Sequence, residues 1–131
     1  APINLEGARD NRTTGLRIPV SEPIDLRIEN RVVGMDCNPY LAIAASLACG
    51  YLGMVNKINA REPVAFEAYD MERALPRSLS ESLDFFEKSR EMKKLFGKSF
   101  CDVFGSVKRH EAEAFMQFIS PWEREHLLLN V

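Results

Sequence analysis

The feature that most constrains the fold is a change of periodicity at Asn38-Pro39. Before this point, residues 16–20 and 26–32 alternate polar and apolar side chains, which is typical of strands with one polar and one apolar face. After it, apolar residues recur at helical spacing. Strands followed by helices predict an α+β fold, with two or three strands in about residues 12–33 and four or five helices in about residues 38–131.

Capping signals divide the helical region. Asn38 suits an N-cap and Pro39 the first helical position, so a helix is predicted from Tyr40 to about Asn56, and its many small residues predict that it is buried. Further helices are predicted over 78–88, 89–96, 98–119 and from Ser120 onward. Between the first two helices, the proline-containing residues 57–77 are predicted to form an irregular, solvent-exposed connection.

Composition and charge bound the class of protein. The chain has 131 residues, of which 46% are hydrophobic and 27% charged, as in ordinary folded proteins. A net charge of -2 gives no electrostatic reason to expect nucleic acid or an anionic membrane as partner. The longest apolar stretch, residues 39–55, is interrupted and short for a bilayer, and the first residues lack signal-peptide features. We therefore expect a cytoplasmic protein with no membrane partner. Three short strands cannot cover a sheet face, which predicts that the chain is part of a larger domain.

Arginines are concentrated in the strand-rich segment, at positions 9, 12, 17, 27 and 31. Alternation places Arg27, Glu29 and Arg31 on one face of their strand. Converging guanidinium groups form a multidentate site for phosphate or carboxylate. Glu29 could pair with these arginines or bind a hard cation such as Mg²⁺ or Mn²⁺. From the residues alone, both an ion-paired strand face and a site for phosphoryl transfer fit this pattern.

Three motifs follow one another along the first 42 residues. They are Asn11-Arg12-Thr13-Thr14-Gly15-Leu16-Arg17-Ile18-Pro19, Arg27-Ile28-Glu29-Asn30-Arg31 and Asp36-Cys37-Asn38-Pro39-Tyr40-Leu41-Ala42. In order and spacing they resemble the C-terminal part of the catalytic domain of the glutamine synthetase family. Weaker similarity continues to Trp122-Glu123-Arg124, so the resemblance covers residues 1–131.

The resemblance implies a role for each charged residue of the first two motifs. Arg12 would be catalytic and approach the transferred phosphate; it would also bind ATP, as would Arg17 and Arg27. Arg31 would bind the substrate glutamate, and Glu29 would be a ligand of the Mg²⁺ or Mn²⁺ that bridges the phosphates. The reaction implied is ATP-dependent formation of a γ-glutamyl amide through γ-glutamyl phosphate.

The identity of the amine stays open between ammonia and a polyamine. Residues 10–15 and the ending Trp122-Glu123-Arg124-Glu125-His126 look closer to the branch that glutamylates putrescine and other amines. Ile24-Asp25-Leu26 departs from the glutamine-forming bacterial enzymes, in which a lysine commonly precedes the Arg-Ile-Glu strand.

Other interpretations remain. The family's other metal ligands would precede this sequence, so the isolated chain is expected to be inactive, and the full-length enzyme is expected to form a homo-oligomer. The alternatives are a non-catalytic glutamine synthetase-like structural or regulatory module and an unrelated anion-binding domain. The remaining candidate residues are expected to have no catalytic role. These are the free thiols Cys37, Cys49 and Cys101, surface His110 and His126, loop Tyr69, and the helical phenylalanines as core or subunit contacts.

Overall fold

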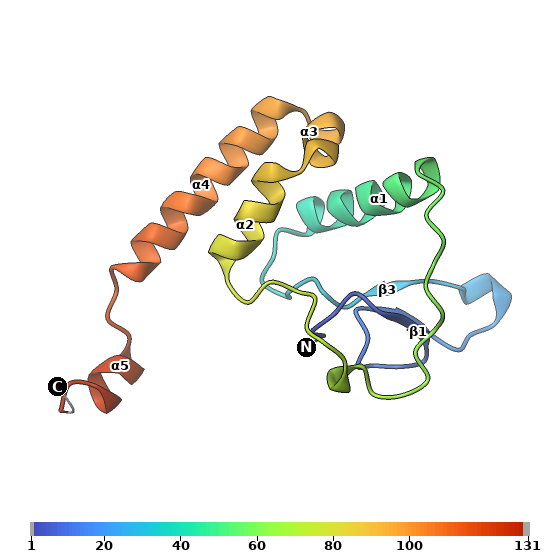
Figure 1. Ribbon diagram of the computed structural model, residues 1–131, viewed down its shortest axis with the longest axis horizontal. Helices are drawn as coiled ribbons and strands as arrows, with labels where there is room; N and C mark the ends of the chain where they lie inside the picture. Colours follow the sequence, from blue (N-terminus) through green and yellow to red (C-terminus); the bar gives the residue numbers. More distant parts are fainter. Residues whose placement is uncertain (1, 130–131) are drawn as a thin grey trace. The chain divides into compact units, whose positions relative to one another are not determined.

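The computed structural model describes residues 2–129, which contain three β-strands and five α-helices (Figure 1). The α+β prediction is confirmed. The chain divides into two compact units, Ala1–Leu75 with all three strands and Pro76–Val131 with four of the helices.

The first unit is built on a small mixed sheet with the order β1-β2-β3. Strand β1 (Gly7–Arg9) is parallel to β2 (Leu16–Ile18), and β2 is antiparallel to β3 (Glu29–Asn30). Strand β1 lies before the predicted strand range of 12–33. The sequence did not predict it, because its three residues show no alternation and only its pairing with β2 defines it as a strand. Strand β3 is shorter than the alternating stretch 26–32, since only Glu29 and Asn30 of that stretch have partners in the three-residue β2.

The connecting residues 57–77 are not simply a solvent-exposed loop. Its backbone hydrogen-bonds to the N-terminal segment, from Val64 N to the Gly7 oxygen at 3.1 Å and from Leu75 N to the Ile3 oxygen at 3.0 Å. Ala68, in the short 3₁₀ helix η2 (Ala68–Asp70), is fully buried, and its carbonyl accepts a hydrogen bond of 2.7 Å from the side chain of buried Asn4. The prediction of an exposed segment over 57–77 is therefore wrong around Ala68, because these long-range bonds hold it against the sheet.

Helix α1 (Pro39–Val55) begins where predicted. The Asn38 side chain accepts from the amides of Tyr40 and Leu41 at 3.0 and 3.3 Å. None of its residues is buried, however, and Ile43 and Leu47 are more than half exposed, so the prediction of a buried helix is wrong for this chain. The physical reason is that the small sheet of the first unit supplies too little surface to cover an apolar helix on several sides.

The second unit is helical throughout. It contains α2 (Leu79–Lys88), α3 (Arg90–Phe96), α4 (Lys98–Met116) and α5 (Pro121–His126). The predicted starts are confirmed by side-chain caps at Ser78, Ser89 and Ser120, the last of which forms a full capping box with Glu123. Gly97, with a φ of 84°, ends α3 in a conformation that favours glycine. Helix α4 ends three residues before the predicted Ile119.

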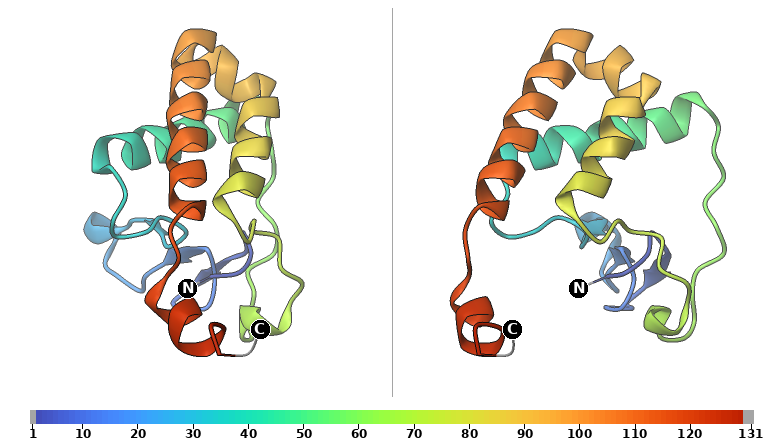
Figure 2. Two further views of the ribbon diagram at one scale, coloured as in Figure 1. Left: turned by 90° about the vertical axis from the view of Figure 1, so that its left-hand side faces the viewer. Right: turned by 60° about the vertical axis from the view of Figure 1, so that its left-hand side comes forward.

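Helices α2 and α4 form the centre of this unit and run side by side (Figure 2). Leu83 of α2 and Cys101 of α4 are buried, and the rings of Phe86 and Phe104 meet edge to face at 5.4 Å. Phe96 and Phe100 also form ring contacts, whereas Phe85, Phe115 and Phe118 are exposed. The predicted core role therefore fits Phe86 and Phe104, and subunit contacts, the other predicted role, stay a prediction for the exposed rings. Among the described residues, no helix is both long and apolar enough to cross a membrane.

Candidate functional site

A cross-strand ion pair lies at the centre of the arginine-rich segment. Arg17 of β2 and Glu29 of β3 stand directly opposite each other in the antiparallel register. Nη1 of Arg17 donates to Oε2 of Glu29 at 2.8 Å. The Arg17 side chain is only 13% exposed, while that of Glu29 is 31% exposed, so the pair is partly shielded from water.

A second carboxylate, that of Asp10, binds the other end of the same guanidinium. Nη2 of Arg17 donates to Oδ1 of Asp10, the residue that follows β1. Arg17 therefore bridges two carboxylates contributed by different parts of the chain. Sequence reasoning assigned no role to Asp10, and its place directly before Asn11-Arg12 is the sequence signal that points to it.

Two further arginines belong to the surroundings of Glu29. Nη2 of Arg27 lies 3.5 Å from Oε1 of Glu29, and Nη1 of Arg27 donates to the Asp25 carbonyl at 3.3 Å. Arg31 is half-buried, and its backbone amide donates to the Gly15 oxygen at 2.8 Å. These positions agree with the predicted shared face of Arg27, Glu29 and Arg31, although Arg27 itself lies just outside β3.

The arginines keep Glu29 ionised. The hydrogen bond from Arg17 is the largest effect on Glu29 and lowers its pKa below the usual value. Partial burial is the next largest effect and opposes it, while the charges of the three arginines lower the pKa further. The Nε atoms of Arg17 and Arg31 are buried and have no hydrogen-bond acceptor among the described residues. These two donors would be satisfied by an anion or a further protein group.

Arg12 projects from a loop that is fixed by its neighbours. Oδ1 of Asn11 accepts from the Thr13 amide at 2.9 Å and from the Thr13 hydroxyl at 2.7 Å, which makes a tight Asx turn. The Asn11 side chain also donates to the Phe66 oxygen at 2.8 Å, and the Thr13 hydroxyl accepts from the Ala68 amide at 2.8 Å. Arg12 is exposed, and no described residue holds its side chain. A rigid loop thus presents a guanidinium whose donors are unused.

The donor set fits a metal ion only in part. Glu29 is an ionised oxygen ligand of the kind that Mg²⁺ and Mn²⁺ prefer. Within residues 2–129, however, no three His, Cys, Asp or Glu side chains come together as a metal-binding group. Glu29 can therefore supply one ligand, and the other ligands would have to come from elsewhere.

The remaining candidates have the ordinary environments that were predicted. All three cysteines are free, with Cys37 and Cys49 exposed and Cys101 buried. His110 is exposed on α4, and His126 is exposed and stacked on Trp122 at 4.7 Å. Tyr69 is 44% exposed in η2. None of these residues lies in the Arg17–Glu29 cluster.

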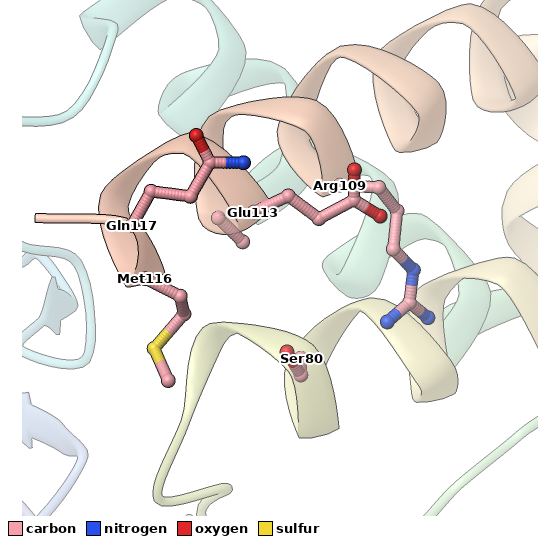
Figure 3. A pocket seen from close by; sticks show the side chains of 6 residues that line it. Ser80, Arg109, Glu113, Met116 and Gln117 are labelled. Carbon is pink, nitrogen blue, oxygen red and sulfur yellow. The ribbon is translucent and has the colours of Figure 1, made fainter.

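A cavity of about 420 Å³ lies between α2 and α4 in the second unit (Figure 3). Arg109 is the cation among the described residues that line it, with Ser80, Glu113, Met116 and Gln117 nearby. The Arg109 guanidinium already donates to Glu87 at 2.9 Å and to Asp84. This single cation is balanced by two carboxylates, whereas the first unit has Arg12, Arg27 and Arg31 in addition to Arg17, so the cavity is the weaker anion site.

Comparisons with known proteins show the family of this chain. The family model described as glutamine synthetase, catalytic domain, matches residues 1–127. Type-1 glutamine synthetase 2 of Dictyostelium discoideum is 38% identical over 98% of this chain and 26% of its own length. Glutamate–isopropylamine ligase of a Pseudomonas species is 36% identical over 87% of this chain and 26% of its own length.

A structural comparison gives the same result. A solved structure described as apo GmaS without ligand matches 96% of this chain and 30% of its own, with a TM-score of 0.78 and 26% sequence identity. The chain thus spans about a quarter to a third of the length of the proteins it matches.

Proposed function

Because this chain belongs to the glutamine synthetase family, we propose that it is the C-terminal segment of an ATP-dependent ligase that forms γ-glutamyl amides. The reaction would pass through γ-glutamyl phosphate, which ammonia or an amine then attacks. In this proposal, residues 1–131 are one part of a larger catalytic domain, and the whole enzyme is a cytoplasmic homo-oligomer.

The observation that carries the proposal is the bridge from Arg17 to Glu29 with Arg27 beside it. Phosphoryl transfer needs positive charge placed in advance around the transferred group. Arg17 and Arg27 of this cluster would bind the ATP phosphates. Arg12, which stands on a loop held by its neighbours and has free donors, would bind the transferred phosphate. Arg31 would hold a carboxylate of glutamate through a guanidinium whose Nε is buried and unpaired.

Glu29 would hold one position of a bound Mg²⁺ or Mn²⁺. When bound, such an ion supplies charge neutralisation between ATP phosphates. The low pKa of Glu29 supports this role, since a metal ligand must be deprotonated at neutral pH. The incomplete ligand set of the described residues supports the further expectation that the isolated chain is inactive.

For the acceptor, we favour an amine over ammonia. The relatives named above include a ligase for isopropylamine as well as a glutamine synthetase, at 36% and 38% identity, so overall identity does not separate the two classes. The motif Asp10-Asn11-Arg12-Thr13-Thr14-Gly15 favours the amine-using branch. A γ-glutamyl-polyamine is accordingly the preferred product, with glutamine as the other outcome.

The test is a phosphate-release assay on the full-length protein that carries this chain, with ATP, glutamate, Mg²⁺ and a panel of acceptors. We expect turnover with putrescine or another amine to exceed that with ammonia. Arg12→Gln should lower kcat by about 10²–10³-fold, as for other groups that stabilise transition-state charge. The matched control is Arg73→Gln, because Arg73 is exposed in the connection and makes no ion pair with a described residue.

Two outcomes would count against parts of the proposal. Failure of the full-length protein to release phosphate with any acceptor would favour a non-catalytic structural or regulatory module. Clear turnover by the 131-residue chain alone would contradict the expectation that its metal site is incomplete.

A further inference from the structure

Asp10 has an unusual backbone conformation directly after β1. Its amide donates to the Ile18 oxygen at 2.9 Å, which extends the parallel β1–β2 pairing by one residue. Its φ is 50°, in the left-handed region that aspartate and asparagine tolerate better than most other non-glycine residues. The chain thus adopts a disfavoured conformation at the residue that links β1 to the Arg12 loop.

The side chain of Asp10 reaches Arg17, the same guanidinium that bonds Glu29. Nη2 of Arg17 donates a hydrogen bond to Asp10 and Nη1 donates one to Glu29, and the Arg17 side chain is only 13% exposed. A planar guanidinium with both ends engaged is fixed in orientation, because rotation would break one of the two bonds. Asp10 therefore determines how Arg17 faces Glu29.

The charge balance shows why this sharing matters. The charges of Arg17, Arg27 and Arg31 all act on the single carboxylate of Glu29. Without a second carboxylate, the Arg17 charge would be directed at Glu29 alone, and three cations would compete with a metal ion for that ligand. With Asp10 present, part of the Arg17 charge is neutralised.

We infer that Asp10 is a positioning residue, which holds Arg17 and shares its charge so that Glu29 remains available to a divalent cation. This inference rests on the proposed metal role of Glu29. Asp10 does not itself bind the cation; it acts through Arg17.

The experiment measures binding of Mn²⁺ alone to the full-length protein by titration calorimetry, without nucleotide. Asp10→Asn is the main variant, because asparagine keeps the left-handed conformation and removes the charge. Asp10→Gly is the second variant, since glycine relieves the backbone and removes the side chain. Glu22→Gln is the matched control, because Glu22 is an exposed carboxylate that makes no side-chain bond to a described residue. Thermal melting checks that each variant is folded.

We expect Asp10→Asn and Asp10→Gly to weaken Mn²⁺ binding by roughly three- to tenfold, at or below the range for direct outer-shell partners of a metal ligand. Glu22→Gln should leave the Kd unchanged. In an Arg17→Lys background, which keeps a positive charge but loses the two-ended guanidinium, Asp10→Asn should have no further effect.

The outcomes separate this inference from the proposed function. If Glu29→Gln weakens Mn²⁺ binding but Asp10→Asn does not, the inference is wrong and the metal role of Glu29 stands. An equal effect of Asp10→Asn with Arg17 intact and in the Arg17→Lys background would show that Asp10 acts as a distant charge, which also overturns the inference. If Glu29→Gln does not weaken Mn²⁺ binding, the metal role fails and the inference fails with it.

Discussion

Arg17 and Glu29 face each other across β2 and β3, and Nη1 of Arg17 lies 2.8 Å from Oε2 of Glu29. This relationship joins the two arginine-containing motifs of the sequence in one site. It also holds the Glu29 carboxylate within reach of Arg27, whose Nη2 lies 3.5 Å from Oε1 of Glu29. Substitutions at Glu29 should therefore affect chemistry more than folding.

Glu29→Gln should lower turnover of the full-length enzyme by about 10²-fold or more, because the charged oxygen ligand is lost. The amide oxygen of glutamine can still accept the Arg17 hydrogen bond, so the melting temperature should change little. Steady-state kinetics at saturating Mg²⁺, together with thermal melting, check both parts. A large loss of thermal stability with kcat retained would contradict this assignment.

Gly15→Ala should destabilise the first unit. A Cβ at position 15 would lie 2.6 Å from the Asn4 backbone oxygen and 3.2 Å from Cγ2 of Val32, so the backbone would have to shift. Overpacking of this kind costs about 1–3 kcal/mol. Because the Arg31 amide bonds the Gly15 carbonyl, the shift should also disturb the strand pairing beside the site. Denaturant unfolding measures the loss.

Gly50→Ala is the matched control for this substitution. Gly50 lies in α1 and an added Cβ would meet nothing within 4 Å, so alanine should stabilise the chain by about 0.5–1 kcal/mol through helix propensity. If the two glycine variants changed the unfolding midpoint in the same direction, the close approach at Gly15 would not be the cause.

The helix starts could be predicted because their signals are local. The cap bonds of Asn38, Ser78, Ser89 and Ser120 all join a side chain to an amide two or three residues later. The prediction that α1 is buried was wrong because burial is not local: the composition of a helix does not show how much surface the rest of the chain offers to cover it. None of the apolar side chains of α1 is fully covered within the described chain.

The features that the sequence did not reveal depend on distant pairs. Strand β1 exists because Gly7 pairs with Leu16, and Ala68 is buried because Asn4 and Thr13 bond its backbone from more than 50 residues away. Alternation predicted that Arg27, Glu29 and Arg31 share a face. The position of Arg17 opposite Glu29 depends on strand register, and the role of Asp10 depends on a backbone angle, neither of which a periodic pattern contains.

Thr14→Val should loosen the loop that carries Arg12. The buried Thr14 hydroxyl lies 2.9 Å from the Asn11 oxygen and 2.8 Å from the Leu16 oxygen, and it donates to one of them at a time. Valine has a similar shape but no donor, so we expect a loss of about 1–3 kcal/mol in unfolding free energy. Thr14→Ser keeps the hydroxyl and should recover most of this loss. Equal unfolding free energies for the valine and serine variants would show that the hydroxyl bond is unimportant.

Acid should weaken the second unit through the network of Arg109 with Asp84 and Glu87. Nε and Nη2 of Arg109 donate to Glu87 at 3.1 and 2.9 Å, and Nη2 also donates to Asp84, which joins α4 to α2. These bonds from Arg109 lower the pKa of both carboxyl groups below their ordinary values of 3.8 and 4.5. A lowered pKa in the folded state means that protonation opposes folding. The stabilisation is therefore complete above about pH 4.5 and is lost as pH falls through the lower folded values.

Arg109→Gln tests this network, because it removes the cation and leaves both carboxyl groups near their ordinary pKa values. Melting temperatures between about pH 7 and pH 3 should fall less steeply below about pH 4.5 in this variant than in the unsubstituted protein. Arg90→Gln is the matched control, since Arg90 is exposed at the start of α3, forms no ion pair with a described residue and carries the same charge. Arg90→Gln should reproduce the change in net charge, but its melting temperature should fall below about pH 4.5 as steeply as that of the unsubstituted protein. Parallel curves for Arg109→Gln and the unsubstituted protein would mean that the network does not couple α2 to α4 in solution.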